Sequence, residues 1–298
     1  MRKLWLTLGL LVAAPVLAQS SSSGEESGRQ FDAGRGAELQ NWEWRARQGA
    51  QPTEAEKAVD AVLNAVRQRD CKGAVAALNA ALAKPTPEVW TLTGALFEEG
   101  VCVKPSWERA VNFYQRAIAV GHPGVAARVA SGYAAPVGGP DKAAALWWAY
   151  RAKTALPAEC QAAAALAEDA DRFVAALQAW PAGQLDACAY AAGVMARIQG
   201  DLESPGLASS FGLEGKVALV FVPALGKVDI TEAMTDAAPP GGVVADGVLR
   251  ERDQRLARQA FTKHLRDTAD RALRRYTPPA AVPAVWRVQT EVAVKLRR

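Results

Sequence analysis

The amino-acid sequence predicts an α+β protein, in which an N-terminal α-solenoid of helix-turn-helix repeats precedes a small three-stranded antiparallel α+β domain. Three observations carry this prediction. Signals for helix starts recur between residues 53 and 203. Within that range, small and aromatic residues repeat at a spacing of about 35 residues, which is typical of two-helix repeats. After residue 203 the chain changes to Val-rich stretches in which apolar and polar residues alternate, and this favours strands.

The first 18 residues have the order of a secretory signal peptide. Arg2 and Lys3 precede the apolar run LWLTLGLLVAAPVL, and small residues at its end provide a cleavage site at Ala18. The run is shorter than the roughly 18 to 20 residues that span a bilayer, so we expect cleavage after Ala18; an uncleaved anchor is the alternative. The mature protein is therefore expected to be periplasmic or secreted, with no stable membrane span.

The charge of the chain is nearly balanced once this segment is removed. The full chain has 35 Lys and Arg against 31 Asp and Glu, and cleavage after Ala18 removes two of the basic residues. So small an excess does not favour binding to nucleic acid. Residues 19–52 begin with SSSGEESGRQ, which is too poor in apolar side chains to form a core. We expect them to form a flexible or partly ordered linker.

From Thr53 onward the chain is punctuated by helix caps. Thr53 and Glu56 have the spacing of a capping box, in which each side chain accepts a hydrogen bond from the other residue's backbone amide. Other short oxygen-bearing side chains stand where further helices would begin, at Asp70, Thr86, Ser106 and Asp141. We expect helices over residues 53–68, 70–83, 87–99, 106–120, 124–134, 141–154, 157–168, 170–180 and 185–200.

An internal repeat organises these helices. Phe97 has a counterpart about 36 residues later in Tyr133. Four further positions recur about 35 residues apart, where Ala110, Phe113, Arg116 and Ala117 correspond to Ala145, Trp148, Arg151 and Ala152. Such a period predicts stacked helix pairs that share one continuous core. We expect the aromatic residues Phe113, Tyr114, Trp147 and Trp148 to fill the space between layers, and the alternative is that they line a ligand groove.

The stretch LTGALFEEGVCVKPSWERAVNFYQRAIAVGHPGVAARVA resembles a Sel-one-like repeat, which is related to the tetratricopeptide repeat. The matching positions are Gly94, Ala95, Leu96, Phe97, Gly100, Val101, Ala110, Phe113, Tyr114, Ala117, Gly121 and His122. The second copy departs from the pattern, because Pro136 replaces the loop glycine. The resemblance implies an interaction scaffold over residues 53–203 and implies no chemistry.

Four cysteines remain in a chain expected to be exported, and an even number favours disulfides. In the repeat geometry, Cys71 and Cys102 fall in the inter-helix turns of successive units, which lie side by side. Cys160 and Cys188 fall near the starts of two neighbouring helices. We therefore predict the pairs Cys71–Cys102 and Cys160–Cys188, each contributing about 3 kcal/mol. A zinc site is the competing interpretation, but close cysteine pairs are absent from the sequence.

The C-terminal part, residues 212–298, predicts the order strand, strand, helix, strand. The stretch KVALVFVPALGKVDITEA reads as two strands around a turn, and a helix is expected from about Leu249 to Arg275. Its predicted apolar stripe comprises Phe261, Leu265, Ala269, Ala272 and Tyr276. From Trp286 to Leu296 apolar and polar residues alternate, which predicts a closing strand with one buried face.

This order resembles the C-terminal domain of TonB-type energy transducers. The residues that carry the likeness are Gly215-Lys216-Val217, Gly226-Lys227-Val228, Tyr276 and Pro278-Pro279. The chain departs from that family in its long Arg-rich helix and in lacking an anchor followed by a Pro-rich spacer. The resemblance implies a ββαβ fold whose closing strand could accept a partner strand by edge pairing.

The sequence contains no motif for catalysis. His122 and His264 stand apart from any nucleophile, and the phosphate-binding, zinc-protease and serine-hydrolase motifs are absent. We therefore expect no catalytic, cofactor-binding or metal-binding residues, no cofactor and no enzyme activity. The acidic groups Glu98-Glu99 and Glu168-Asp169-Asp171 are expected to be solvated or to cap helices. Five arginines on the predicted helix could hold an acidic partner or a polyanionic envelope glycan, although such a face is more often simply solvated; they are Arg258, Arg266, Arg271, Arg274 and Arg275.

These inferences predict a periplasmic or secreted scaffold of the bacterial cell envelope that binds a protein partner through its helical repeats. An envelope enzyme or accessory acting on cell-wall material is one alternative, and a TonB-like transducer component is another.

Overall fold

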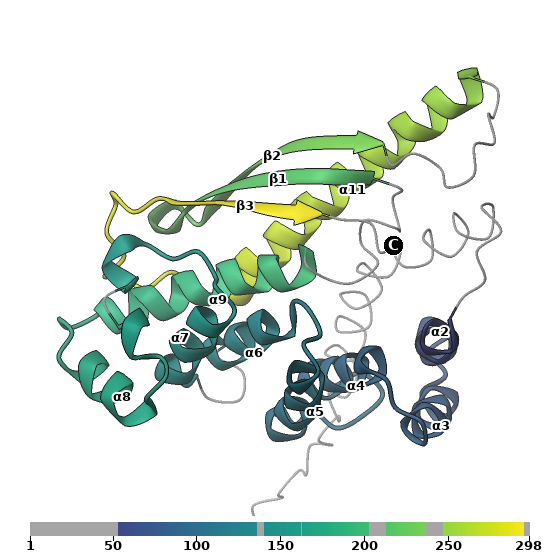
Figure 1. The fold of residues 1–298 in the computed structure, drawn as a ribbon, viewed down its shortest axis with the longest axis horizontal. Helices are drawn as coiled ribbons and strands as arrows, with labels where there is room; N and C mark the ends of the chain where they lie inside the picture. Colours follow the sequence, from purple (N-terminus) through teal and green to yellow (C-terminus); the bar gives the residue numbers. More distant parts are fainter. Residues whose placement is uncertain (1–52, 136–139, 162, 203–212, 237–246, 295–298) are drawn as a thin grey trace, which may run out of the picture.

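The computed structural model describes residues 53–135, 140–161, 163–202, 213–236 and 247–294 (Figure 1). These residues form a mostly helical structure with one three-stranded antiparallel sheet, which confirms the predicted α+β class. The expected signal peptide at 1–18 and the expected linker at 19–52 lie outside the described residues.

The helical part is built from short helices whose bounds lie close to those predicted. Their caps explain why: the side chains of Thr53, Asp70, Ser106 and Asp141 each accept a hydrogen bond from the backbone amide three residues later. The helices are α2 (Glu54–Arg67), α3 (Cys71–Leu82), α4 (Pro87–Glu99), α5 (Trp107–Ala119), α6 (Val125–Ala134), α7 (Lys142–Arg151), α8 (Ala170–Gln178) and α9 (Gln184–Leu202).

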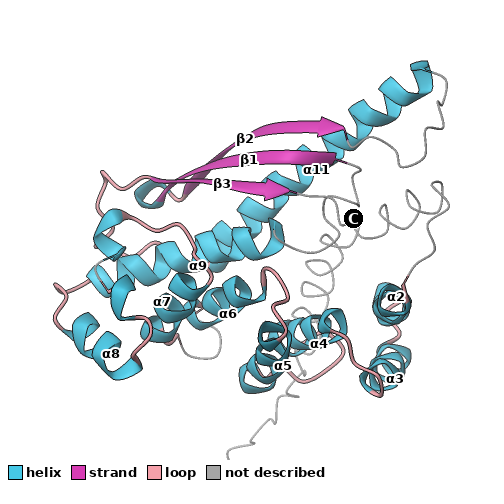
Figure 2. Ribbon diagram, viewed as in Figure 1, coloured by secondary structure: helices cyan, strands magenta, loops and turns pink. Residues whose placement is uncertain are grey.

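Consecutive helices pack as neighbours in the pairs α2–α3, α4–α5 and α6–α7. Helix α9 then packs against α6 and α7, and α11 (Gly247–Arg275) contacts α9 as well (Figure 2). Because α9 has helices against it from both parts of the chain, most of its side chains are buried, including Val194, Met195 and Ile198. A helix that is mostly apolar is expected in such a central position.

One predicted helix is wrong. Residues 157–168 form two 3₁₀ turns, Ala158–Gln161 and Ala164–Leu166, instead of an α-helix. Cys160 is fully buried and bonded to Cys188 of α9, and the hydroxyl of Tyr150 donates a hydrogen bond to its carbonyl oxygen. These tertiary contacts hold the Ala-rich segment in 3₁₀ turns, although its composition favours an α-helix.

Both predicted cysteine pairs are present as disulfides. Cys71 is joined to Cys102, with a Cα–Cα distance of 4.8 Å, and Cys160 is joined to Cys188, at 5.6 Å. The first bond ties the start of α3 to the loop after α4. The second ties a 3₁₀ turn to α9, so Cys160 does not occupy the helix start where it was expected.

The C-terminal part has the predicted order of elements. Strands β1 (Leu213–Val222), β2 (Lys227–Asp236) and β3 (Val288–Val294) form a sheet in the order β2-β1-β3, with both pairs antiparallel. A 3₁₀ turn over Pro223–Leu225 and Gly226, at a φ of 53°, connects the first two strands. That left-handed conformation favours glycine. The last residues of the predicted closing strand, 295–298, lie outside the described part of the chain.

Helix α11 packs against one face of the sheet, and its N-terminal half extends past the strands (Figure 1). The predicted apolar stripe is buried throughout: Phe261, Leu265, Ala269, Ala272 and Tyr276 are each at most 4% exposed. The same apolar cluster includes Leu219 and Phe221 of β1 and Val194, Met195 and Ile198 of α9. The sheet and the helical part therefore share one core through α9.

Candidate functional site

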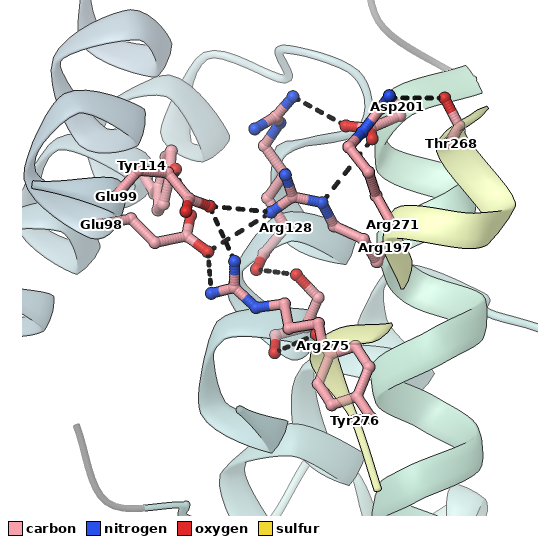
Figure 3. Close-up of polar contacts among 11 residues, drawn as sticks. Glu98, Glu99, Tyr114, Arg128, Arg197, Asp201, Thr268, Arg271, Arg275 and Tyr276 are labelled. Carbon is pink, nitrogen blue, oxygen red and sulfur yellow. Dashed lines mark hydrogen bonds and ion pairs between the residues drawn. The ribbon is translucent and has the colours of Figure 1, made fainter. Parts of the chain in front are cut away.

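A buried group of charged side chains lies between α4, α6, α9 and α11 (Figure 3). We call it the interdomain ion network, because it joins the helical part to the helix of the C-terminal part. Its members are Glu98, Glu99, Arg128, Arg197, Asp201, Arg271 and Arg275. The side chain of Glu98 is only 3% exposed and that of Asp201 12%.

Arg275 of α11 holds both glutamates at the end of α4. Its Nη2 lies 2.7 Å from Glu98 Oε1, and its Nη1 lies 2.7 Å from Glu99 Oε1. The hydroxyl of Tyr114 donates to Glu98 Oε2 at 2.7 Å. The guanidinium fork thus bridges two carboxylates with charge-assisted hydrogen bonds, the strongest kind that side chains make.

Arg197 of α9 connects this pair to Asp201. Its Nη1 lies 3.5 Å from Glu98 Oε1 and 3.4 Å from Glu99 Oε1, and its Nε lies 3.6 Å from Asp201 Oδ2. Arg128 of α6 completes the chain of contacts, because its Nη2 lies 2.9 Å from Asp201 Oδ1. Helix α4 therefore meets α11 directly through ion pairs, and α9 and α6 are linked to it through the same chain of contacts.

Two hydrogen bonds from α11 and the residue after it border the network. Arg271 donates from Nη2 to Thr268 Oγ1 at 2.8 Å, and Tyr276 donates from its hydroxyl to the carbonyl oxygen of Ser131 at 2.7 Å. Both residues are buried: Arg271 is 8% exposed and Tyr276 is 4% exposed. The end of α11 is thus attached to α6 by a hydrogen bond and to α4 by ion pairs.

Arg197 and Asp201 of the network remain ionised because opposite charges stabilise them. Burial alone would lower the pKa of Arg197, but the carboxylates of Asp201, Glu99 and Glu98 outweigh burial and raise that pKa well above its ordinary value. Burial would raise the pKa of Asp201, but Arg197 and Arg128 outweigh it and lower that pKa. Carboxylates with lowered pKa values next to arginines do not exchange protons near neutral pH. The arrangement therefore joins α4, α6, α9 and α11 within the chain.

His264 of α11 lies at the border of this network. Burial lowers its pKa, Asp201 opposes that shift and Arg271 reinforces it. We therefore expect the imidazole to be neutral at pH 7, where it adds no charge to the network. The other histidine, His122, is half-buried, and its backbone amide donates to the carbonyl oxygen of Ala117 at the end of α5.

The expectation that Glu98 and Glu99 would be solvated or capping is wrong, because both are held by arginines from other elements. One signal in the sequence pointed to this. The last turn of a helix is unfavourable for acidic side chains, so two glutamates at the end of α4 indicate cations nearby. Asp169 does cap α8, accepting from the amide of Arg172, while Glu168 and Asp171 are exposed.

The five arginines predicted on the long helix do not form one surface. Arg271 and Arg275, four residues apart, point towards α9 and α4 on the buried side of α11. Arg258, Arg266 and Arg274 are exposed. The prediction of a single five-arginine face is therefore wrong, because helical spacing divides the set between the network and the surface.

The four aromatic residues expected between the layers also differ in burial. Tyr114 is fully buried, whereas Phe113, Trp147 and Trp148 are half-buried. Trp147 packs edge-on against Phe173, with the ring centroids 5.4 Å apart. The aromatic residues thus contribute mainly to packing between helices, as expected, and three of them also reach the surface.

A hollow of about 380 Å³ lies between the end of α7 and the 3₁₀ turns, lined by Tyr150, Arg151, Lys153, Thr154, Gln161 and Glu168 among others. Among these six side chains, no hydroxyl group is hydrogen-bonded to a carboxylate that could act as its base. Across the ranges that the structure describes, no three His, Cys, Asp or Glu side chains gather in a way that could hold a metal ion. None of the described helices combines the length and apolar character that crossing a membrane requires.

Comparisons of the chain with protein-family models, with curated proteins and with solved structures give no match. The resemblances to Sel-one-like repeats and to the TonB C-terminal domain therefore stay predictions.

Proposed function

We propose that the protein is a periplasmic or secreted interaction scaffold of the bacterial cell envelope, which binds a protein partner through repeated helix pairs. The observation that carries this proposal is the agreement between repeat-related positions. Ala110 of α5 and Ala145 of α7 are both 0% exposed. Phe113 and Trp148 are both half-buried, and each lies beneath an exposed arginine, Arg116 or Arg151. These positions 35 residues apart thus agree in burial and in their guanidinium–ring contacts, which supports stacked repeats.

The compartment is supported by the two disulfides. Such bonds persist in oxidising compartments and are rare in the cytosol of most organisms. Cys71–Cys102 and Cys160–Cys188 each join elements about 30 residues apart. Together with the signal-peptide pattern at residues 1–18, they favour export. N-terminal sequencing of the protein from a periplasmic fraction should begin at Gln19, and a chain that retains Met1 in the cytosol would contradict this part of the proposal.

The C-terminal part offers a second contact. With the order β2-β1-β3, no described strand pairs with the outer edge of β3, and that edge could accept an extended segment of a partner. The exposed arginines of α11, Arg258, Arg266 and Arg274, support contact with an acidic envelope partner. The interdomain ion network would hold these two surfaces in a constant orientation relative to the repeats.

Affinity capture from an envelope extract, followed by reconstitution with the purified partner, tests the scaffold proposal. The bait should be the oxidised mature chain, and an unrelated exported protein of similar charge serves as the control. A partner that binds the purified bait in solution would support the proposal. A hydrolase screen on cell-wall material runs in parallel, and turnover with no partner recovered would overturn the scaffold in favour of an envelope enzyme.

A further inference from the structure

Three exposed arginines on α5 and α7 lie over aromatic rings. The guanidinium carbon of Arg109 is 5.5 Å from the ring centroid of Phe97, and that of Arg116 is 5.4 Å from Phe113. Arg151 covers two rings, at 5.9 Å from Trp147 and 5.7 Å from Trp148. Phe97 and Phe113 also stack on each other, with centroids 5.9 Å apart and planes 4° from parallel. Each guanidinium is thereby held by a ring at the surface.

These arginines differ from those of the interdomain ion network in one respect. Arg128, Arg197 and Arg275 all contact carboxylates. Among the described residues, no carboxylate forms an ion pair with Arg109, Arg116 or Arg151. Glu108 is the neighbour of Arg109 in sequence, and its side chain is exposed. A guanidinium stacked on a ring still directs its five N–H donors outward in its own plane. Three oriented groups of donors therefore face solvent.

The spacing of these groups follows the repeat in part. Arg109 and Arg116 are seven residues apart, two turns along α5, which corresponds to about 10.5 Å of helix rise. Arg116 and Arg151 occupy positions 35 residues apart, whereas the position 35 residues after Arg109 is Ala144, so the second unit supplies one guanidinium. Trp148, which lies under Arg151, also packs against the apolar cluster that contains Ala117 of α5, so the groups lie on adjacent elements. Guanidinium groups on adjacent elements match a partner that carries several anionic groups.

We propose that Arg109, Arg116 and Arg151 form the contact surface for an acidic peptide segment of a partner protein. The planar fork of arginine matches a carboxylate with two parallel hydrogen bonds. A glycan is the less suitable occupant, because sugar rings bind by stacking on open aromatic faces. Here each ring already has a guanidinium over it. This inference rests on the proposed scaffold function and names the surface and chemistry of its contact.

The test measures binding of a fluorescein-labelled oligoglutamate to the mature oxidised chain by fluorescence anisotropy. The triple variant R109Q/R116Q/R151Q should bind about 30-fold more weakly, because it loses three pairs of charge-assisted hydrogen bonds. The matched control R172Q/R255Q/R287Q removes the same charge from exposed positions elsewhere on the molecule and should stay within about threefold of the native chain. Far-UV circular dichroism of both variants checks that the fold is kept.

A third variant, R109K/R116K/R151K, keeps the charge and loses the planar fork, and we expect it to bind about fivefold more weakly than the native chain. Equal loss in both glutamine triples, or no binding by the native chain, would overturn the proposal. Tighter binding of a polyuronate than of oligoglutamate would assign the surface to a glycan and overturn it too. If the native chain captures a partner and R109Q/R116Q/R151Q captures it equally, this inference fails while the scaffold function stands.

Discussion

Replacing Arg275 by glutamine tests whether the interdomain ion network stabilises the native state. Arg275 bridges Glu98 and Glu99 at 2.7 Å each, and its removal leaves both carboxylates with Arg197 at 3.4 to 3.5 Å. Glutamine keeps a polar side chain that can donate hydrogen bonds, but it is shorter than arginine and carries no charge. The variant R275Q therefore removes the shortest ionic contacts between α11 and α4 and leaves the apolar core intact.

The expected loss follows from burial. Breaking a fully buried ion pair by removing one partner costs about 3 to 5 kcal/mol, because a charge is left desolvated. The side chain of Arg275 is 21% exposed and that of Glu98 is 3% exposed, so water compensates only in part. We expect R275Q to lower the free energy of unfolding by about 2 to 3 kcal/mol. The double variant E98Q/R275Q should lose about 2 kcal/mol less than the sum of the two single variants, since the pair is then absent altogether.

Urea unfolding followed by circular dichroism measures these values. The matched control is K216Q, which removes an ion pair of 2.6 Å to Glu291 whose side chains are 62% and 53% exposed. Its loss should be below about 1 kcal/mol. If R275Q lowered the free energy of unfolding no more than K216Q does, the reasoning would be refuted. The network would then orient α11 relative to α4 without stabilising the native state.

Three other predictions follow from the same structure. The variant C71S/C102S should lose about 3 kcal/mol of stability relative to the oxidised chain, measured by urea unfolding, and an unchanged midpoint would contradict the role of this bond. A Cβ at Gly132 would lie 2.0 Å from the ring of Trp107, so G132A should cost about 2 kcal/mol or more. G121A adds a Cβ with nothing within 4 Å at a φ of 74°, and should cost only about 1 kcal/mol. Burial lowers the pKa of His264 from 6.5, so the stability linked to its neutral form is complete above pH 6.5 and falls as pH drops towards the lowered value. The variant H264Q should lose that slope in unfolding curves recorded below pH 6.5, and an unchanged slope would assign it to another group.

Much of the fold could be predicted from the sequence because its determinants are local. A cap such as Thr53 acts on an amide three residues away, and the stripe from Phe261 to Tyr276 follows the period of one helix. The alternation at Val288, Val292 and Val294 likewise reflects one strand with one buried face. Such rules need only the neighbours along the chain.

The candidate site could not be predicted in this way, because its partners are distant in sequence. Glu98 and Arg275 are 177 residues apart, and Arg128 and Asp201 are 73 apart. No local pattern states which arginine of an Arg-rich helix will meet which acid. The 3₁₀ turns at Ala158–Gln161 and Ala164–Leu166 have the same origin, since a disulfide and packing overrode helix propensity there.

By itself, then, the sequence determined where most helices and strands lie, which of their faces are apolar and which cysteines can pair, since short-range hydrogen bonding and periodicity govern these features. Only the tertiary structure decided that α9 joins the two parts in one core, and that Glu98, Glu99 and Asp201 are buried with arginines from three helices. The physical reason is that buried charge is stable only where opposite charge lies within a few ångströms, and that proximity arises from the packing of whole elements.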